Sequence, residues 1–94
     1  MVGIHTSTEW KRKVKEFDNK CAYCGVEFDS KIKVTRDHLI PINVQPIGHI
    51  WNMVPACQSC NSKKHTSDCI SFIKKYGYSL RPELAVALES LQDI

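Results

Sequence analysis

Two Cys-x-x-Cys pairs, Cys21-Ala-Tyr-Cys24 and Cys57-Gln-Ser-Cys60, constrain the fold of this chain more than any other feature. The two residues inside each pair form a knuckle that points both sulfurs at one ion, and two knuckles complete a tetrahedral site with no open position. Such a closed site is typical of structural zinc, and disulfides or a redox pair are the alternatives. We therefore expect one structural zinc per chain, held by Cys21, Cys24, Cys57 and Cys60.

The length of 94 residues predicts a single domain spanning 1–94. A domain this short buries only about 60% of its unfolded surface, so its core is thin. Structural zinc contributes about 10–16 kcal/mol of binding free energy in small peptides, whereas a whole domain is stable by about 5–15 kcal/mol. Loss of zinc should therefore unfold much of the chain. The fifth cysteine, Cys69, is expected to be a buried apolar thiol.

The chain has neither a transmembrane stretch nor a basic leader followed by an apolar run, which predicts a cytoplasmic protein with no membrane partner. Its formal net charge is +3, and four thiolates around one Zn²⁺ lower this to about +1. Residues 1–64 hold ten Lys and Arg against six Asp and Glu, whereas residues 65–94 hold three against four. The basic first part favours an electropositive face for phosphates, although a solvated lysine-rich surface has the same composition.

The coarse secondary structure follows from periodicity and turn residues. The expected elements are a helix over 7–18, a strand over 31–36, a loop over 41–50, a short strand over 51–54, a helical turn from about 60, and helices over 68–76 and 82–92. On the first strand, Ile32 and Val34 should point inward. The helical turn should carry Asn61, Lys64 and His65.

Beside the knuckles lie polar residues that a simple zinc module does not need. These are Asp37-His38 at the end of the expected strand, Asn52, and Asn61 after the last cysteine of the pairs. Singly they are ordinary, because Asp and Asn commonly cap helices or form turns. Together with the runs Cys-x-Tyr-Cys-Gly, Thr-Arg-Asp-His-Leu-Ile-Pro, Trp-Asn-Met-Val-Pro-Ala-Cys and Cys-Asn-x-x-Lys, they closely resemble the zinc-containing form of the HNH endonuclease family.

This resemblance implies a small α+β fold. A β-hairpin and a helix grip one divalent cation in the ββα-metal motif, which the Cys₄ zinc site staples and which N-terminal and C-terminal helices flank. The motif core would span about residues 10–66, and residues 67–94 would form a helical scaffold. The third signature position is Asn61 rather than His, the HNN variant, which is compatible with activity and bears on the preferred metal.

The same resemblance implies roles for the polar residues. His38 is the general base, Asp37 and Asn61 hold the catalytic divalent ion, and Asn52 orients the loop that carries the histidine. A free histidine pKa near ~6.5 suits proton removal from water at neutral pH. One carboxylate and one amide oxygen favour Mg²⁺ or Mn²⁺. His65 would share a helical face with Asn61, and its participation would favour other divalent ions such as Ni²⁺ or Zn²⁺.

Lys64 resembles the family's helix lysine and is the candidate phosphate contact, with Lys63 and Arg36 as weaker ones. The implied function is hydrolysis of DNA phosphodiester bonds, by nicking or by double-strand cutting. The alternative is a zinc-stapled DNA-binding or adaptor module without catalysis. Action on RNA ranks lower, because the sequence displays no stacking platform for single strands. The resemblance also implies a phage or mobile-element setting, and a homodimer or larger nucleoprotein assembly stays open.

Overall fold

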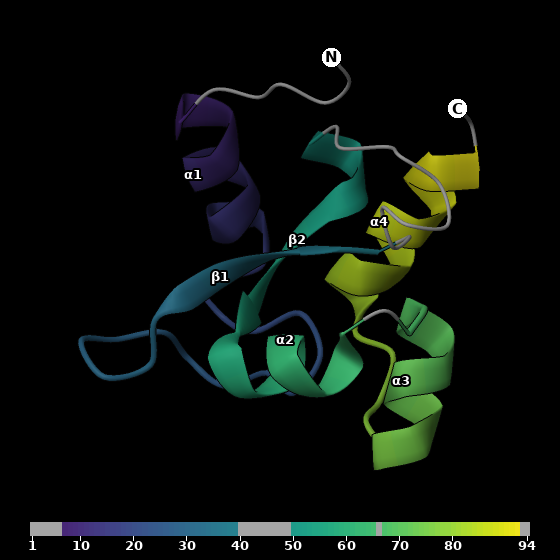
Figure 1. Ribbon diagram of the computed structural model, residues 1–94. Coiled ribbons are helices and arrows are strands. Elements are labelled where there is room, and N and C mark those ends of the chain that lie inside the picture. The colour runs from purple at the N-terminus through teal and green to yellow at the C-terminus, as the bar shows by residue number, and fades with distance from the viewer. Residues whose placement is uncertain (1–6, 40–49, 66, 93–94) are drawn as a thin grey trace.

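The computed structural model describes residues 7–39, 50–65 and 67–92. In chain order the elements are α1 (Ser7–Glu16), β1 (Val34–His38), the 3₁₀ turn η1 (Ile50–Asn52), β2 (Met53–Cys57), α2 (Gln58–Lys64), α3 (Cys69–Tyr76) and α4 (Pro82–Gln92). The two strands pair as an antiparallel sheet, with α1 and α2 packed against them and α3 and α4 to one side (Figure 1). The expected small α+β class is confirmed.

The strands pair in a register that runs from Val34 opposite Cys57 to His38 opposite Met53. Pro55, which has no N–H, lies opposite Arg36 without breaking the ladder, because its carbonyl points away from β1 and accepts from Ala22 N at 2.9 Å. The knuckle that carries the first cysteine pair is thereby tied to the outer edge of β2.

Both strands begin later than predicted. The expected strand over 31–36 is replaced up to residue 33 by a turn, in which Asp29 Oδ1 accepts from the backbone N–H groups of Lys31 and Ile32 at 2.8 and 2.7 Å. Val34 is 37% exposed, so its predicted inward orientation was wrong. Asp37 and His38 are consequently part of β1 rather than the residues after it.

The second strand also starts later than expected. The residues predicted as a strand over 51–54 lie partly in the turn η1, and β2 continues to Cys57. Cys57, the first cysteine of the second pair, is therefore the last residue of β2, and α2 follows without a linker. The expected loop over 41–50 lies, except for Ile50, outside the described residues.

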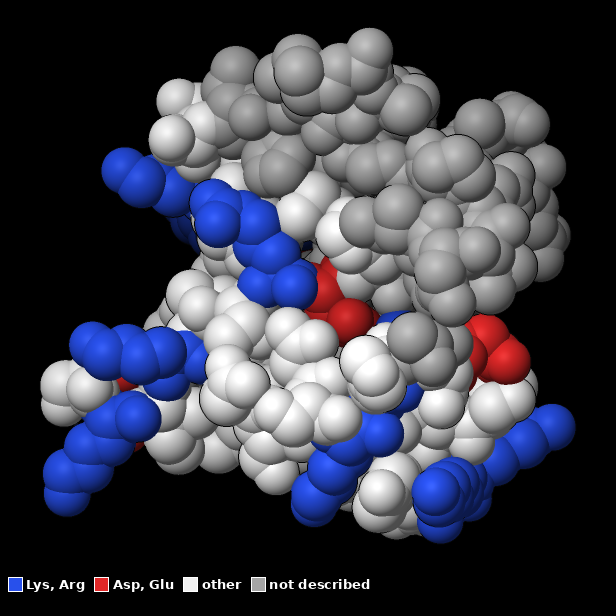
Figure 2. Space-filling view, viewed as in Figure 1, with Lys and Arg blue, Asp and Glu red and all other residues white. Residues whose placement is uncertain are grey.

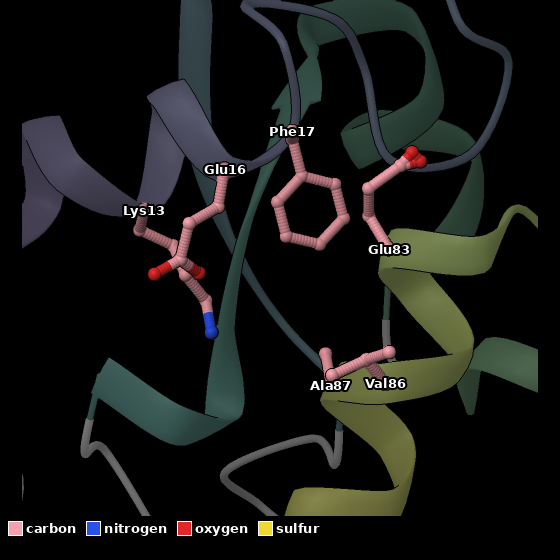
Figure 3. A pocket seen from close by; sticks show the side chains of 6 residues that line it. All are labelled: Lys13, Glu16, Phe17, Glu83, Val86 and Ala87. Carbon is pink, nitrogen blue, oxygen red and sulfur yellow. The ribbon is translucent and has the colours of Figure 1, made fainter.

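The helix α1 ends two residues before its predicted end at 18, because Asp18 and Asn19 adopt positive φ angles of 60° and 58°. Trp10 of α1 and Phe17, which follows the helix, are both buried. A cavity of about 300 Å³ lies between α1 and α4, and Phe17 lines it together with residues of both helices (Figure 3). None of the predicted site residues lines this cavity.

The two C-terminal helices agree with the prediction to within a residue. Asp68 caps α3 by accepting from Ser71 N at 2.8 Å, and Gly77 ends it with a φ of 71°. Cys69 is buried at 2% exposure, as expected, whereas Tyr76 is 38% exposed. Leu84, at 0% exposure, fixes α4 in the core. Among the described residues, no helix has the length and apolar character needed to cross a membrane.

Candidate functional site

The four cysteines of the two pairs converge on one point. Their sulfurs all lie within 4.8 Å of one another, and Cys24 Sγ is 3.8 Å from Cys57 Sγ. A tetrahedral zinc about 2.3 Å from each sulfur would hold the sulfurs roughly 3.8 Å apart, so the donor set fits the ion. A disulfide needs about 2.05 Å, and all five cysteines are free thiols. The geometry therefore supports a metal site, consistent with zinc.

Local backbone geometry builds each knuckle. In the first, Gly25 donates to Cys21 O at 3.0 Å and adopts a φ of 80°, which only glycine takes without strain. In the second, Cys57 ends β2 and its sulfur accepts from Cys60 N at 3.4 Å in the first turn of α2. Arg81, next to α4, donates from Nη1 to Cys21 O at 2.8 Å, so the C-terminal scaffold is anchored on the cysteine cluster.

The thiols influence one another electrostatically. A hydrogen bond from the Cys60 thiol lowers the pKa of Cys21 to about 4, and the same interaction raises the pKa of Cys60. Burial raises the pKa of Cys24, which is nevertheless the exposed member of the four. A groove of about 420 Å³ beside the cluster is lined by Cys24 and gives an ion a path to the sulfurs.

A second polar cluster joins β1 to α2. Asp37 is 5% exposed, and its Oδ2 accepts a hydrogen bond from the Tyr23 hydroxyl and lies 3.1 Å from Lys64 Nζ. Lys64 is 1% exposed and also donates to the carbonyl of His38 at 2.7 Å. A buried ion pair is tolerated only where further hydrogen bonds satisfy both groups, and here they do. Lys64, which was predicted to contact phosphate, is thus buried and bonded to two residues of β1.

Asn61 is fixed to β1 through its amide nitrogen. Nδ2 donates to Thr35 Oγ1 at 2.9 Å and to the carbonyl of Arg36 at 3.2 Å. A carbonyl only accepts, so the nitrogen must be the atom that faces it, and neither bond uses Asn61 Oδ1. Arg36 and Pro55 form a non-hydrogen-bonded pair of the ladder, so Arg36 O points away from β2 and Asn61 supplies a partner for it.

His38 and Asp37 are neighbours at the end of β1, and alternation along the strand sends their side chains to opposite faces. Thr35 and Asp37 contact α2, whereas Arg36 stacks on Trp10 of α1, with its guanidinium 4.9 Å from the ring centroid. His38 is the last residue of β1 and is half-buried. The structure thus brings Asp37 and the α2 residues together at this strand end, and for His38 to serve the same phosphate the chain must bend where the strand ends.

The remaining predicted residues lie around this cluster. Asn52 is fully buried, and its carbonyl accepts from Leu39 N at 2.8 Å, which holds the backbone directly after His38. His65 ends α2 with a φ of 46° and is exposed, so it is not a helical residue and its spacing from Asn61 does not place the two on one helical face.

Exposed cations lie near the cluster. Arg36 is exposed on β1, and Lys63 is exposed on α2 with its Nζ 5.3 Å from the Tyr76 ring centroid. On the face seen in Figure 2, Lys and Arg side chains gather over α1, the turn before β1, α2 and α3. Three of these segments belong to residues 1–64, where the basic excess was predicted, whereas α3 belongs to the second part of the chain.

Tyr23 reaches Asp37 from inside the first knuckle, a role that the sequence did not predict. The available signal was its residue type. A knuckle needs only two small residues between its cysteines. A large side chain with a polar tip at this position therefore indicates a hydrogen-bond partner elsewhere in the fold. Arg81 was missed as well, because its contact with Cys21 joins distant parts of the chain.

The cysteine cluster, the β-hairpin and the helix that follows it define a zinc-type ββα protein. The sequence model of the HNH endonuclease family matches residues 21–67, half of the chain, and the chain belongs to this family.

Two relatives share this region. YoqL, an SPbeta prophage-derived protein of Bacillus subtilis (strain 168) whose name places it among the HNH endonucleases, is 37% identical over 67 residues. The Septu protein PtuB of Bacillus thuringiensis is 35% identical over 54 residues. The matches cover 64% and 54% of this chain but only 29% and 21% of the two relatives, so the chain spans less than a third of either.

Proposed function

We propose that this chain is a metal-dependent endonuclease that hydrolyses DNA phosphodiester bonds. The observation that carries the proposal is the anchoring of the two expected metal ligands. Asp37 is held through Oδ2 and Asn61 through Nδ2, and none of these contacts uses the Oδ1 atom of either residue. Two oxygen donors on adjoining elements suit a hard cation such as Mg²⁺ or Mn²⁺ better than a soft one.

The chemistry requires an activated water and neutralisation of charge on the phosphate. A bound divalent cation supplies the positive charge that stabilises the phosphate and the leaving oxygen. His38 takes the proton from the attacking water as general base. The backbone carbonyl of Asn52 accepts from Leu39 N, and the buried Asn52 amide is proposed to orient the same segment next to His38. His65, which directly follows α2, stays a candidate additional ligand of the divalent ion.

DNA is the proposed partner, because the family and the prophage relative are named as endonucleases. Exposed Arg36 and Lys63 are the proposed phosphate contacts. Buried Lys64 contributes indirectly, because it pairs with Asp37. Nicking and double-strand cutting are both compatible with this proposal, and so are a single chain, a homodimer and a larger assembly. A cytoplasmic setting is part of the proposal, because four reduced thiols bind zinc where disulfides do not form.

One observation favours the alternative of a zinc-stapled module without catalysis. The ammonium of Lys64 already neutralises Asp37 inside the protein, so the carboxylate does not need a metal ion for its charge to be balanced. PtuB, one of the two relatives, is named as a Septu protein and not as a nuclease. Such a module would keep its DNA binding when His38 is replaced.

Plasmid cleavage distinguishes the two functions. Zinc-loaded protein is incubated with supercoiled plasmid, with and without added Mg²⁺ or Mn²⁺, so that the cysteine site stays filled in every sample. We expect nicked or linear product only with the added ion, and at least ~10²-fold slower cleavage by His38→Ala. The matched control is His5→Ala, a histidine of the same chain with no proposed role in the site, measured alongside. No cleavage by the wild type would support the binding module, whereas equal cleavage by wild type and His38→Ala would contradict His38 as the general base.

A further inference from the structure

Tyr23 lies between the first two zinc-site cysteines and ends on Asp37. It is 1% exposed, its ring meets Phe72 edge-on at a centroid distance of 5.2 Å, and its hydroxyl donates to Asp37 Oδ2. The hydroxyl is the donor in this bond, because a carboxylate oxygen only accepts. One side chain therefore bridges the cysteine cluster and β1.

Within the described part of the chain, the contacts of the Asp37 carboxylate fall on one of its two oxygens. Oδ2 receives the Tyr23 hydroxyl and lies 3.1 Å from Lys64 Nζ, which in turn sits 5.9 Å from the centre of the Tyr23 ring. The two donors come from different elements, the first knuckle and α2. Together they fix the rotation of the carboxylate and hence the direction of Oδ1.

We propose that Tyr23 is a positioning residue that links zinc binding to the catalytic metal site. Zinc at Cys21 and Cys24 fixes the knuckle backbone, the knuckle fixes the Tyr23 hydroxyl, and the hydroxyl aims Asp37 Oδ1 at the divalent ion. The inference rests on the proposed role of Asp37 as a ligand. Partners that orient a metal ligand typically change metal affinity or activity by about 10–100-fold when they are removed.

The direct test is Tyr23→Phe, which keeps the ring against Phe72 and removes only the hydroxyl. Calorimetry with Mn²⁺ on zinc-loaded protein without DNA should give roughly 10–100-fold weaker binding. The matched control is Tyr76→Phe, whose ring also contacts Phe72, at 5.0 Å, but which does not touch Asp37. The control should bind Mn²⁺ like the wild type, and both variants should hold one zinc per chain.

Cleavage gives a second readout that simple core packing would not change. The Mn²⁺ concentration for half-maximal cleavage should rise in Tyr23→Phe, while the rate at saturating Mn²⁺ stays closer to that of the wild type. Unchanged Mn²⁺ affinity and an unchanged half-maximal concentration in folded Tyr23→Phe would overturn the inference. Failure of the wild type to bind Mn²⁺ at all would instead overturn the proposed function, so the two failures are distinguishable.

A measurement on the wild type covers the case in which Tyr23→Phe does not fold. Cadmium-113 substituted into the cysteine site reports its surroundings by NMR. Because Tyr23 lies between two of the ligands, Mg²⁺ binding near Asp37 should shift the cadmium resonance, with the midpoint that calorimetry gives for Mg²⁺ on the same protein. A cadmium resonance that ignores saturating Mg²⁺ would show that the two sites are independent.

Discussion

The buried ion pair between Asp37 and Lys64 gives a sharp stability prediction. The two side chains are 6% and 1% exposed, and Lys64 Nζ serves both Asp37 Oδ2 at 3.1 Å and the carbonyl of His38 at 2.7 Å. Lys64→Met keeps most of the side-chain volume but leaves a buried carboxylate with one polar partner fewer. Removing one member of a buried pair costs about 3–5 kcal/mol.

That loss is large for a domain stable by about 5–15 kcal/mol. Urea unfolding of zinc-saturated protein should therefore show a much lower midpoint for Lys64→Met. The matched control is Lys63→Met, its exposed neighbour on α2, which should change stability by no more than about 0.5 kcal/mol. A second replacement, Asp37→Leu in the Lys64→Met background, should recover much of the loss because no unpaired charge remains.

The divalent ion adds a further arm to this experiment. If it binds at Asp37, Mg²⁺ replaces the missing ammonium and stabilises Lys64→Met, by about 2.7 kcal/mol at 100 times its dissociation constant. Wild type should gain less, because Lys64 already balances Asp37. A cost below about 1 kcal/mol for Lys64→Met would refute the reasoning, as would Mg²⁺ stabilisation that is equal in both proteins.

The remaining predictions concern the staple and the scaffold. Elemental analysis should find one zinc per chain, and stripping it with a thiol reagent and a chelator should abolish the cooperative melt. A cooperative melt that survives zinc removal would contradict the staple. Asp68→Ala should destabilise α3 by about 0.5–2 kcal/mol at neutral pH. Hydrogen bonds from Ser71 lower the pKa of Asp68, so its contribution is present above the unfolded pKa and is lost as pH falls through the folded value. A difference from wild type that persists unchanged in strong acid would contradict that assignment.

The sequence predicted the cysteine cluster and the C-terminal helices well, because local rules govern both. Sulfurs three residues apart in a knuckle share one ion, and caps such as Asp68 and Gly77 act within a turn of their own helix. Errors arose where a side chain competed for backbone hydrogen bonds. Asp29 captures the N–H groups that the predicted strand over 31–36 needed, and β1 starts later as a result.

Long-range polar contacts were beyond sequence reasoning. Nothing in the spacing of Tyr23, Asp37 and Lys64 shows that the three meet, because β1, α2 and the first knuckle must first be folded together. Lys64 therefore looked like a surface cation, when burial makes it a partner of the carboxylate. His65 was likewise assigned to a helix that ends one residue before it.

The central claim is that β1 and α2 together hold a divalent ion beside His38. Crystals of zinc-loaded protein soaked in Mn²⁺ test it directly through anomalous scattering at the manganese edge. We expect manganese at about 2.0–2.3 Å from Oδ1 of both Asp37 and Asn61, separate from zinc at the cysteines. Manganese found only elsewhere, or absent at saturating concentration with Asp37 still paired to Lys64, would contradict the account.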